Sequence, residues 1–174
     1  MCLPAFAIEQ PVNGREALLK LLAGEWITKS LHVVNQLSIP QYLQSGPKKI
    51  EDLAKYVQCD EQNLYRIMRM LASEGVFREM PGRVFSNGPL GDLLAESDPQ
   101  SLHSLTQFYS QEIHQSWDQL QDCLKTGKPA FDLTYGEAVF PYFQKHPKSG
   151  VLFVNAMMEK SKVVIEECID AYDF

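Results

Sequence analysis

The sequence predicts a mainly α-helical fold with one small β-wing of two or three strands. Apolar residues recur at steps of three and four through most of the 174 residues, the periodicity of helices with one buried face. Strand-like segments flank a turn signal at Pro81-Gly82. Apolar residues make up 45% of the chain, which is enough for one core or for two small subdomains.

The charge and the cysteines argue against several classes of protein. The chain has 22 acidic and 16 basic residues, a net charge of −6 and no strongly basic segment, so a nucleic-acid-binding surface is not expected. No apolar run approaches the ~18 residues of a membrane span, and the N-terminus lacks the regions of a secretory signal. Four scattered cysteines without a CxxC pair favour a reducing compartment, so we expect a cytoplasmic protein.

The first 47 residues divide into an arm and a long helix. Residues 1–14 contain two prolines and show no sustained periodicity, which predicts an N-terminal arm. Residues 15 to about 37 are apolar nearly all round, and such a helix needs cover on more than one side. We expect a second subunit to contact it at Leu22 and Trp26. Ser38-Ile39-Pro40 interrupts it, so residues 15–47 are interpreted as a dimerisation helix and a linker.

Residues 48–90 have the plan of a winged-helix module. A short helix is expected at 50–56, and a turn follows in which Asp60 can cap the next helix at 61–74. Gly75 stands where a helix commonly ends in a left-handed conformation. Residues 76–80 and 83–86 then read as two strands around the Pro81-Gly82 turn.

This module is consistent with two interpretations, a DNA-binding unit and a scaffold. Tyr65, Arg66 and Arg69 lie on the second helix, where a repressor presents the side chains that read DNA. The module has seven basic and six acidic residues, so it lacks the excess of cations that phosphate contact needs. We therefore favour a scaffold in which these arginines pair with acidic side chains.

Residues 91–174 are expected to form a helical dimerisation and substrate-lid segment. Helices are predicted at 90–95, 100–110, 112–125, 137–145 and 149–172, with residues 97–99 capping the second and Gly127 ending the third. Phe131, Tyr135 and Gly136 are placed in a loop. In the last helix Glu159 is expected to face water, opposite an inward stripe that includes Val154, Met157, Met158, Ser161 and Ile165. Methionines and aromatic residues at this spacing suit either a core or the wall of an adaptable pocket, and composition does not separate the two.

Several catalytic motifs are absent from the sequence. It contains no GxGxxG, GxxxxGK[ST], HExxH or GxSxG motif. The four histidines are distant from one another, and none has a partner at the helical spacing of a metal ligand. We therefore expect neither a metal site nor a catalytic residue within these 174 residues.

An ordered series of short motifs carries a family resemblance. They are Leu22-Ala23-Gly24-Glu25-Trp26, Leu53-Ala54, Leu64-Tyr65-Arg66-Ile67-Met68-Arg69-Met70-Leu71-Ala72-Ser73-Glu74-Gly75-Val76-Phe77, Pro89-Leu90-Gly91-Asp92-Leu93-Leu94, Trp117-Asp118-Gln119-Leu120, Lys125-Thr126-Gly127-Lys128-Pro129-Ala130-Phe131, Tyr135-Gly136 and Phe153-Val154-Asn155-Ala156-Met157-Met158. From about residue 15 onward, the chain resembles the N-terminal half of the caffeate- and hydroxyindole-type O-methyltransferases, in their bacterial form.

The resemblance implies an embedded winged helix, an intertwined homodimer interface and a lid over the active site of a following Rossmann-like domain. It implies that the substrate pocket is lined by Ile113, Val139, Phe143, Phe153 and Met157. Met157 and Ser161 would lie near S-adenosylmethionine, although Lys160 stands where family members carry a histidine before that serine. The general base would be a histidine of the second domain.

That second domain, which would follow residue 174, is expected to be absent from this chain. S-adenosylmethionine would then bind only in the full-length enzyme, and this chain alone would be inactive on its small, aromatic, hydroxyl-bearing substrate. Two alternatives remain open: a winged-helix transcription regulator whose last helices form a dimer and effector domain, or a truncated paralogue that partners a full-length subunit.

Overall fold

A computed structural model describes residues 13–171, without the side chains of residues 163, 164 and 166–171. The predicted arm therefore lies outside the described residues, except for its last two positions. The elements are α1 (Gly14–Gln36), α2 (Ile39–Leu43), β1 (Lys48–Lys49), α3 (Ile50–Val57), α4 (Glu61–Ser73), β2 (Phe77–Met80), β3 (Val84–Asn87), α5 (Pro89–Asp92), α6 (His103–Ser110), α7 (Glu112–Ser116), a 3₁₀ turn (Trp117–Gln119), α8 (Leu120–Thr126), α9 (Ala130–Tyr135), α10 (Val139–Lys145) and α11 (Pro147–Ala171). The fold is mainly helical with one small sheet, as the sequence predicts.

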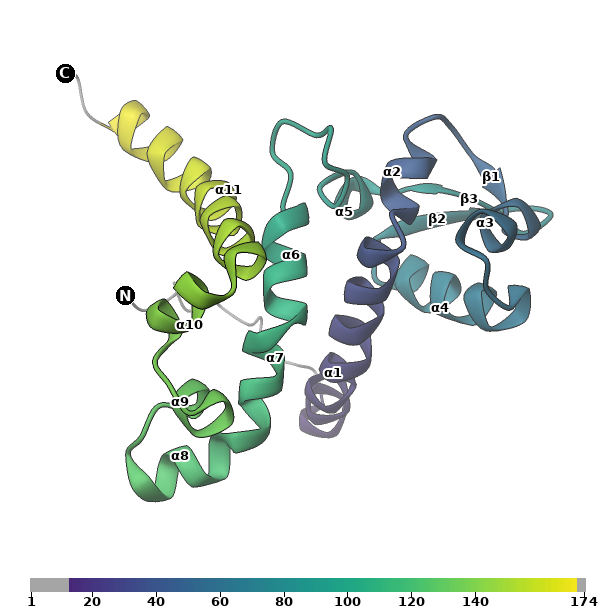
Figure 1. The fold of residues 1–174 in the computed structure, drawn as a ribbon. Coiled ribbons are helices and arrows are strands. Elements are labelled where there is room, and N and C mark those ends of the chain that lie inside the picture. Colours follow the sequence, from purple (N-terminus) through teal and green to yellow (C-terminus); the bar gives the residue numbers. More distant parts are fainter. Residues whose placement is uncertain (1–12, 172–174) are drawn as a thin grey trace.

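The second half of α1 packs with α2–α5 and the sheet into the first core of the molecule (Figure 1). The three antiparallel strands lie in the order β1-β3-β2, with Lys49 opposite Val84 and Arg78 opposite Ser86. Fully buried side chains at the centre of this core are Val34, Ile39, Ile50, Leu53, Met68, Leu71, Phe77 and Phe85. These come from every element between α1 and β3 except β1, so the helices and the sheet share one apolar interior.

The predicted ends of α4 are confirmed. The Asp60 carboxylate accepts the backbone N–H of Asn63 at 2.8 Å, which pairs one of the orphan donors of the first turn. Gly75 has a φ of +79°, and the N–H of Val76 returns to the carbonyl of Leu71. Only glycine adopts this backbone conformation without strain, so helix and strand meet where the sequence predicts.

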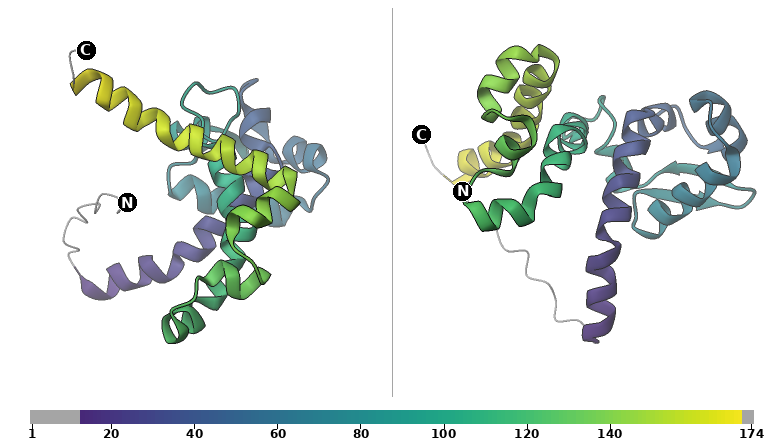
Figure 2. Two further views of the ribbon diagram at one scale, coloured as in Figure 1. Left: turned by 60° about the vertical axis from the view of Figure 1, so that its left-hand side comes forward. Right: turned by 60° about the horizontal axis from the view of Figure 1, so that its bottom comes forward.

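The second half of the chain forms a separate layer of helices. α11 packs along α6, and the chain continues from the end of α6 through α7, α8 and α9, where α9 contacts both α7 and α8 (Figures 1 and 2). Its core consists of Phe108, Phe143 and Ala156, with partly buried apolar residues around them. None of the described helices is both long and apolar enough to cross a membrane.

Three predicted elements differ from the structure. The helix predicted at 100–110 begins only at His103, because the Asp98 carboxylate accepts the N–H of Gln100 and the N–H of Ser101 bonds to the Asp98 carbonyl in a turn. The helix predicted at 112–125 is divided by the 3₁₀ turn. The Ser116 hydroxyl donates to the Glu112 carbonyl at 2.9 Å, a contact that often bends helices. The predicted loop at Phe131 is helix α9, which starts after Pro129.

Candidate functional site

Three phenylalanines from three helices form an aromatic wall in the second layer. Phe108 of α6, Phe143 of α10 and Phe153 of α11 have ring centroids 5.2 to 6.1 Å apart. Their tilted and edge-on arrangement is the one that the charge distribution of aromatic rings favours. The wall therefore has a defined shape, set by contacts between segments up to 45 residues apart in sequence.

The structure brings the five expected substrate residues together at this wall. Phe143 belongs to the buried cluster, and the other four, Ile113, Val139, Phe153 and Met157, pack against it while remaining partly exposed. They come from α7, α10 and α11. Partly exposed apolar side chains gathered on one wall could contact a planar apolar molecule.

Other parts of the predicted stripe on α11 lie outside this wall. Ser161 is exposed and stands four residues beyond Met157. Val154, Met158 and Ile165 are more than half exposed, so the prediction that they point inward is wrong for the single chain. Among the described side chains of α11, Ala156 is fully buried, and α6 and α10 are the helices that pack against α11.

A groove missed by the sequence reasoning adjoins Ile113. It encloses about 310 Å³ and is lined by Ile113, Ser116, Trp117, Leu120, Cys123, Ala130 and Phe131. Trp117 and Leu120 are in register with Ile113 on the predicted 112–125 helix, but in the structure their side chains are 63% and 43% exposed. The 3₁₀ turn reorients this segment, and periodicity gives no sign of such a break.

Hydrogen bonds of Glu112 and its neighbour Gln115 join α7 to α11 and to α9. The Ser149 hydroxyl donates to the Glu112 carboxylate at 2.5 Å, and the Tyr135 hydroxyl donates to Gln115 at 2.7 Å. Burial, and then the nearby Glu112 carboxylate, raise the pKa of Tyr135 and of Tyr142. Both phenols therefore remain neutral near neutral pH and can act as hydrogen-bond donors. Within the described residues no three His, Cys, Asp or Glu side chains could hold a metal ion.

The first half of α1 presents a second candidate surface. Leu22 and Trp26, the expected subunit contacts, are 64% and 69% exposed, and Leu18, Leu19 and Leu21 are more than half exposed beside them. We call these five residues the α1 apolar surface. In contrast, Val34 and Asn35 near the end of the same helix are buried in the chain's own core. A contiguous apolar surface of this kind marks a protein interface more often than a surface in water.

An acidic side chain engages one of the two arginines on the exposed face of α4, Arg69, while no ion pair of Arg66 is seen among the described residues. The Tyr65 hydroxyl donates to Glu79 at 2.8 Å, and Arg69 lies 3.5 Å from the same carboxylate. Arg83 pairs with Glu61 at 3.6 Å and lies over the Tyr65 ring. The expected pairing of the α4 arginines with acids is thus seen for Arg69, and it lowers the positive charge that this face offers to phosphate.

His32 joins α1 to α7 and should make the fold sensitive to acid. It is buried edge-on against His114 at 5.9 Å, and burial, then His114 and Lys29, lower its pKa from 6.5 to about 4. Between pH 6.5 and pH 4, His32 is protonated in the unfolded chain but stays neutral in the folded chain. The free energy of unfolding therefore falls as the pH drops from 6.5 toward 4. With allowance for solvent screening, we expect a loss of ~2 kcal/mol.

Urea unfolding at pH 7 and pH 4.5 would measure this loss. The variant His32→Gln, which cannot titrate, should lose less stability between the two pH values than the parent chain. His146→Gln removes an exposed histidine and should behave as the parent does. Equal acid sensitivity in the parent and in His32→Gln would contradict the assignment.

Curated relatives of the chain are methyltransferases. It is 34% identical to phenazine O-methyltransferase PhzM of Lysobacter antibioticus, over 90% of this chain and 46% of that protein. It is 29% identical to phenazine-1-carboxylate N-methyltransferase of Pseudomonas aeruginosa, over 90% of this chain and 46% of that protein. The mitomycin biosynthesis 6-O-methyltransferase of Streptomyces lavendulae is 30% identical, over 97% of this chain and 47% of that protein. The chain thus spans about half the length of the curated relatives it matches.

Solved structures of similar proteins share the fold of this chain. The structure of LaPhzM matches with a TM-score of 0.88 at 33% identity, over 94% of this chain and 49% of that one. The pyocyanin biosynthetic protein PhzM matches with a TM-score of 0.85 at 28% identity, over 92% and 48%. Residues 19–97 match the family model of the O-methyltransferase dimerisation domain.

Proposed function

We propose that this chain is the dimerisation and substrate-lid region of a methyltransferase that acts on a small aromatic molecule. The observation that carries the proposal is the meeting of the five expected substrate residues at one aromatic wall, on a chain whose first helix leaves an apolar surface uncovered. The relatives named for phenazine and mitomycin substrates support an aromatic acceptor. One relative is an N-methyltransferase, so either oxygen or nitrogen could accept the methyl group.

The proposal divides the work among the parts of the chain. Residues 48–90 form a winged-helix module that acts as a scaffold, and residues 15–47 supply the helix that pairs two subunits. Residues 91–174 close over the substrate, with Phe153 and Met157 facing it and Ser161 toward the methyl donor. Methyl transfer needs an acceptor atom aligned with the methyl carbon at near-contact distance. The cofactor site and the general base that achieve this would belong to a further domain.

Calorimetry with S-adenosylmethionine tests this division of labour. We expect the purified 174-residue chain to give no binding heat at micromolar to millimolar cofactor, because the proposal places the cofactor site in a further domain. Heat that fits a micromolar dissociation constant would contradict the proposal. Folding of the same sample is checked by circular dichroism, so that an unfolded chain is not mistaken for a chain without a site.

A transcription regulator is the second candidate, because the helix-turn-helix arrangement of α3 and α4 is also that of DNA-binding proteins. The engagement of Arg69 and Arg83 by Glu79 and Glu61 disfavours it. We expect no salt-sensitive shift of duplex DNA in a gel. Micromolar binding that weakens steeply between 50 and 200 mM salt would favour the regulator instead.

A further inference from the structure

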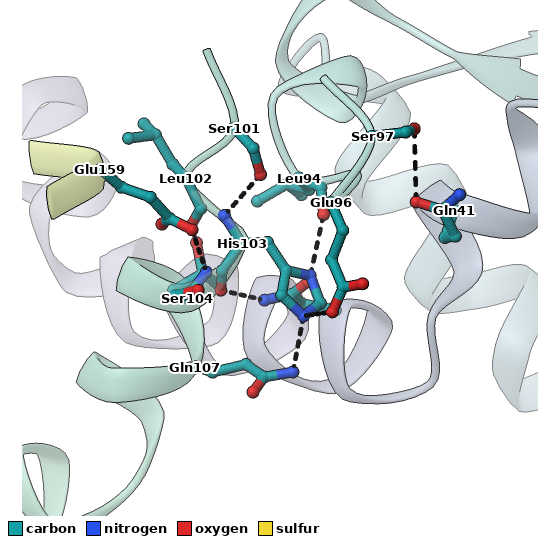
Figure 3. Close-up of polar contacts among 12 residues, drawn as sticks. Gln41, Leu94, Glu96, Ser97, Ser101, Leu102, His103, Ser104, Gln107 and Glu159 are labelled. Carbon is teal, nitrogen blue, oxygen red and sulfur yellow. Dashed lines mark hydrogen bonds and ion pairs between the residues drawn. The ribbon is translucent and has the colours of Figure 1, made fainter. Parts of the chain in front are cut away.

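One turn of the backbone, at the start of α6, is held from two sides by side chains of two other helices. The Asn35 side chain of α1 donates to the carbonyl of His103 at 2.9 Å. The Glu159 carboxylate of α11 accepts the next two N–H groups, those of Ser104 at 3.0 Å and Leu105 at 2.8 Å (Figure 3). Glu159 was expected to face water, and the structure places it at this contact instead.

The first turn of α6 depends on Glu159 because its own residues supply few partners. Leu102 occupies the N-cap position and has no side chain that accepts a hydrogen bond. Ser101 accepts the N–H of His103, which leaves the N–H groups of Ser104 and Leu105 without a local acceptor. A carboxylate at a helix N-terminus is favoured by the helix dipole, and its bonds to backbone N–H groups are charge-assisted.

The opposite side of this turn is anchored to the first layer. Asn35 is 1% exposed, so its bond to the His103 carbonyl is made in a buried environment. The His103 ring contacts the Leu94 carbonyl at 3.1 Å and the Glu96 carboxylate at 3.1 Å. The start of α6 is therefore fixed to α1 and to the segment after α5, independently of α11 (Figure 3).

We propose that Glu159 is the positioning residue of the lid, which sets the place of α11 against α6 and hence against α1. Glu159 stands two residues from Met157 and two from Ser161, the residues expected beside the methyl donor. Through Asn35, the same turn ties the lid to the helix that carries the α1 apolar surface. The assignment of Met157 and Ser161 rests on the proposed function; the contact between Glu159 and α6 does not.

Amide exchange by NMR on the 174-residue chain tests this contact. Glu159→Gln keeps the shape of the side chain but replaces one acceptor with a donor. We expect exchange of the Ser104 and Leu105 amides to quicken by about 10-fold or more, while amides of the first core are unchanged. Glu74→Gln removes an equal charge at an exposed site and should leave both amides as they are. Unchanged exchange at Ser104 and Leu105 in Glu159→Gln would overturn the proposal.

A second readout reports the position of α11. The Met157 side chain packs against the cluster of Phe108, Phe143 and Ala156, so we expect the NMR shift of its methyl group to carry a ring-current displacement. We expect this displacement to shrink in Glu159→Gln and to persist in Glu74→Gln.

If Glu159→Gln does not fold, Glu159→Asp keeps the charge but is too short to reach both N–H groups, and the same two signals should change. If the Met157 shift stays fixed while the two amides exchange faster, the proposal that Glu159 positions α11 is also overturned. Neither signal requires methyl transfer, so they separate this proposal from the proposed function.

Discussion

The variant Gly91→Ala is expected to lose about 3 kcal/mol or more of its unfolding free energy. A Cβ atom at residue 91 would lie 2.3 Å from the backbone carbonyl oxygen of Val76, and that oxygen already accepts the N–H of Gly88 at 2.8 Å. The atom in closest conflict belongs to the backbone, so no rotation of a side chain relieves it. Relief would require α5 to shift away from β2, which would disturb the edge of the first core.

Urea unfolding followed by circular dichroism would measure this loss at one fixed protein concentration. Gly14→Ala is the matched control, because a Cβ atom there meets nothing within 4 Å. It should change stability by no more than ~0.5 kcal/mol. An unfolding midpoint of Gly91→Ala equal to that of the control would show that α5 does not pack as described.

The double variant Leu22→Glu/Trp26→Glu is expected to convert a dimer into a monomer. Both side chains are more than 60% exposed in the single chain and belong to the α1 apolar surface. If a second subunit covers them, two carboxylates would be buried without partners, and the dissociation constant of the dimer should rise by about 100-fold or more. The exposed position of both residues means that each subunit should still fold.

Sedimentation equilibrium at micromolar concentration would measure this change. Lys20→Glu is the control on the same helix, since a residue two positions from Leu22 does not share its face. It makes the same change of net charge as the double variant and should leave the dimer intact. A stable monomer of the parent chain at micromolar concentration would contradict the proposed pairing directly.

The helices of the first layer follow from local signals in the sequence. Asp60 and Gly75 set the ends of α4 through contacts with their own neighbours, so no distant residue is needed to predict them. In the segment from Trp117 to Phe131, by contrast, local signals in the sequence do not predict the structure. Its apolar spacing fits one long helix, but the bend arises from Ser116 and the groove from packing against α9. Spacing therefore predicts that a helix forms but does not show what covers it.

The candidate site was predictable only in part. The five expected substrate residues came from the family resemblance alone. No periodic pattern relates Ile113 to Met157, which is 44 positions away. Glu159 escaped prediction for a different reason. A charged residue on an amphipathic helix is ordinarily solvated. The partners of Glu159 are backbone N–H groups, which every residue except proline has, so no residue type in the sequence indicates them.

The continuity of α1 links assembly to folding. α1 is one uninterrupted helix whose last turns lie inside the chain's own core and whose first turns leave the α1 apolar surface exposed (Figure 2). If two subunits bury those first turns, their association draws the folding equilibrium forward by mass action. The melting temperature should then climb as the solution is concentrated and sink on dilution. A cell that makes little of this protein would hold it nearer to its unfolding threshold than one that makes much.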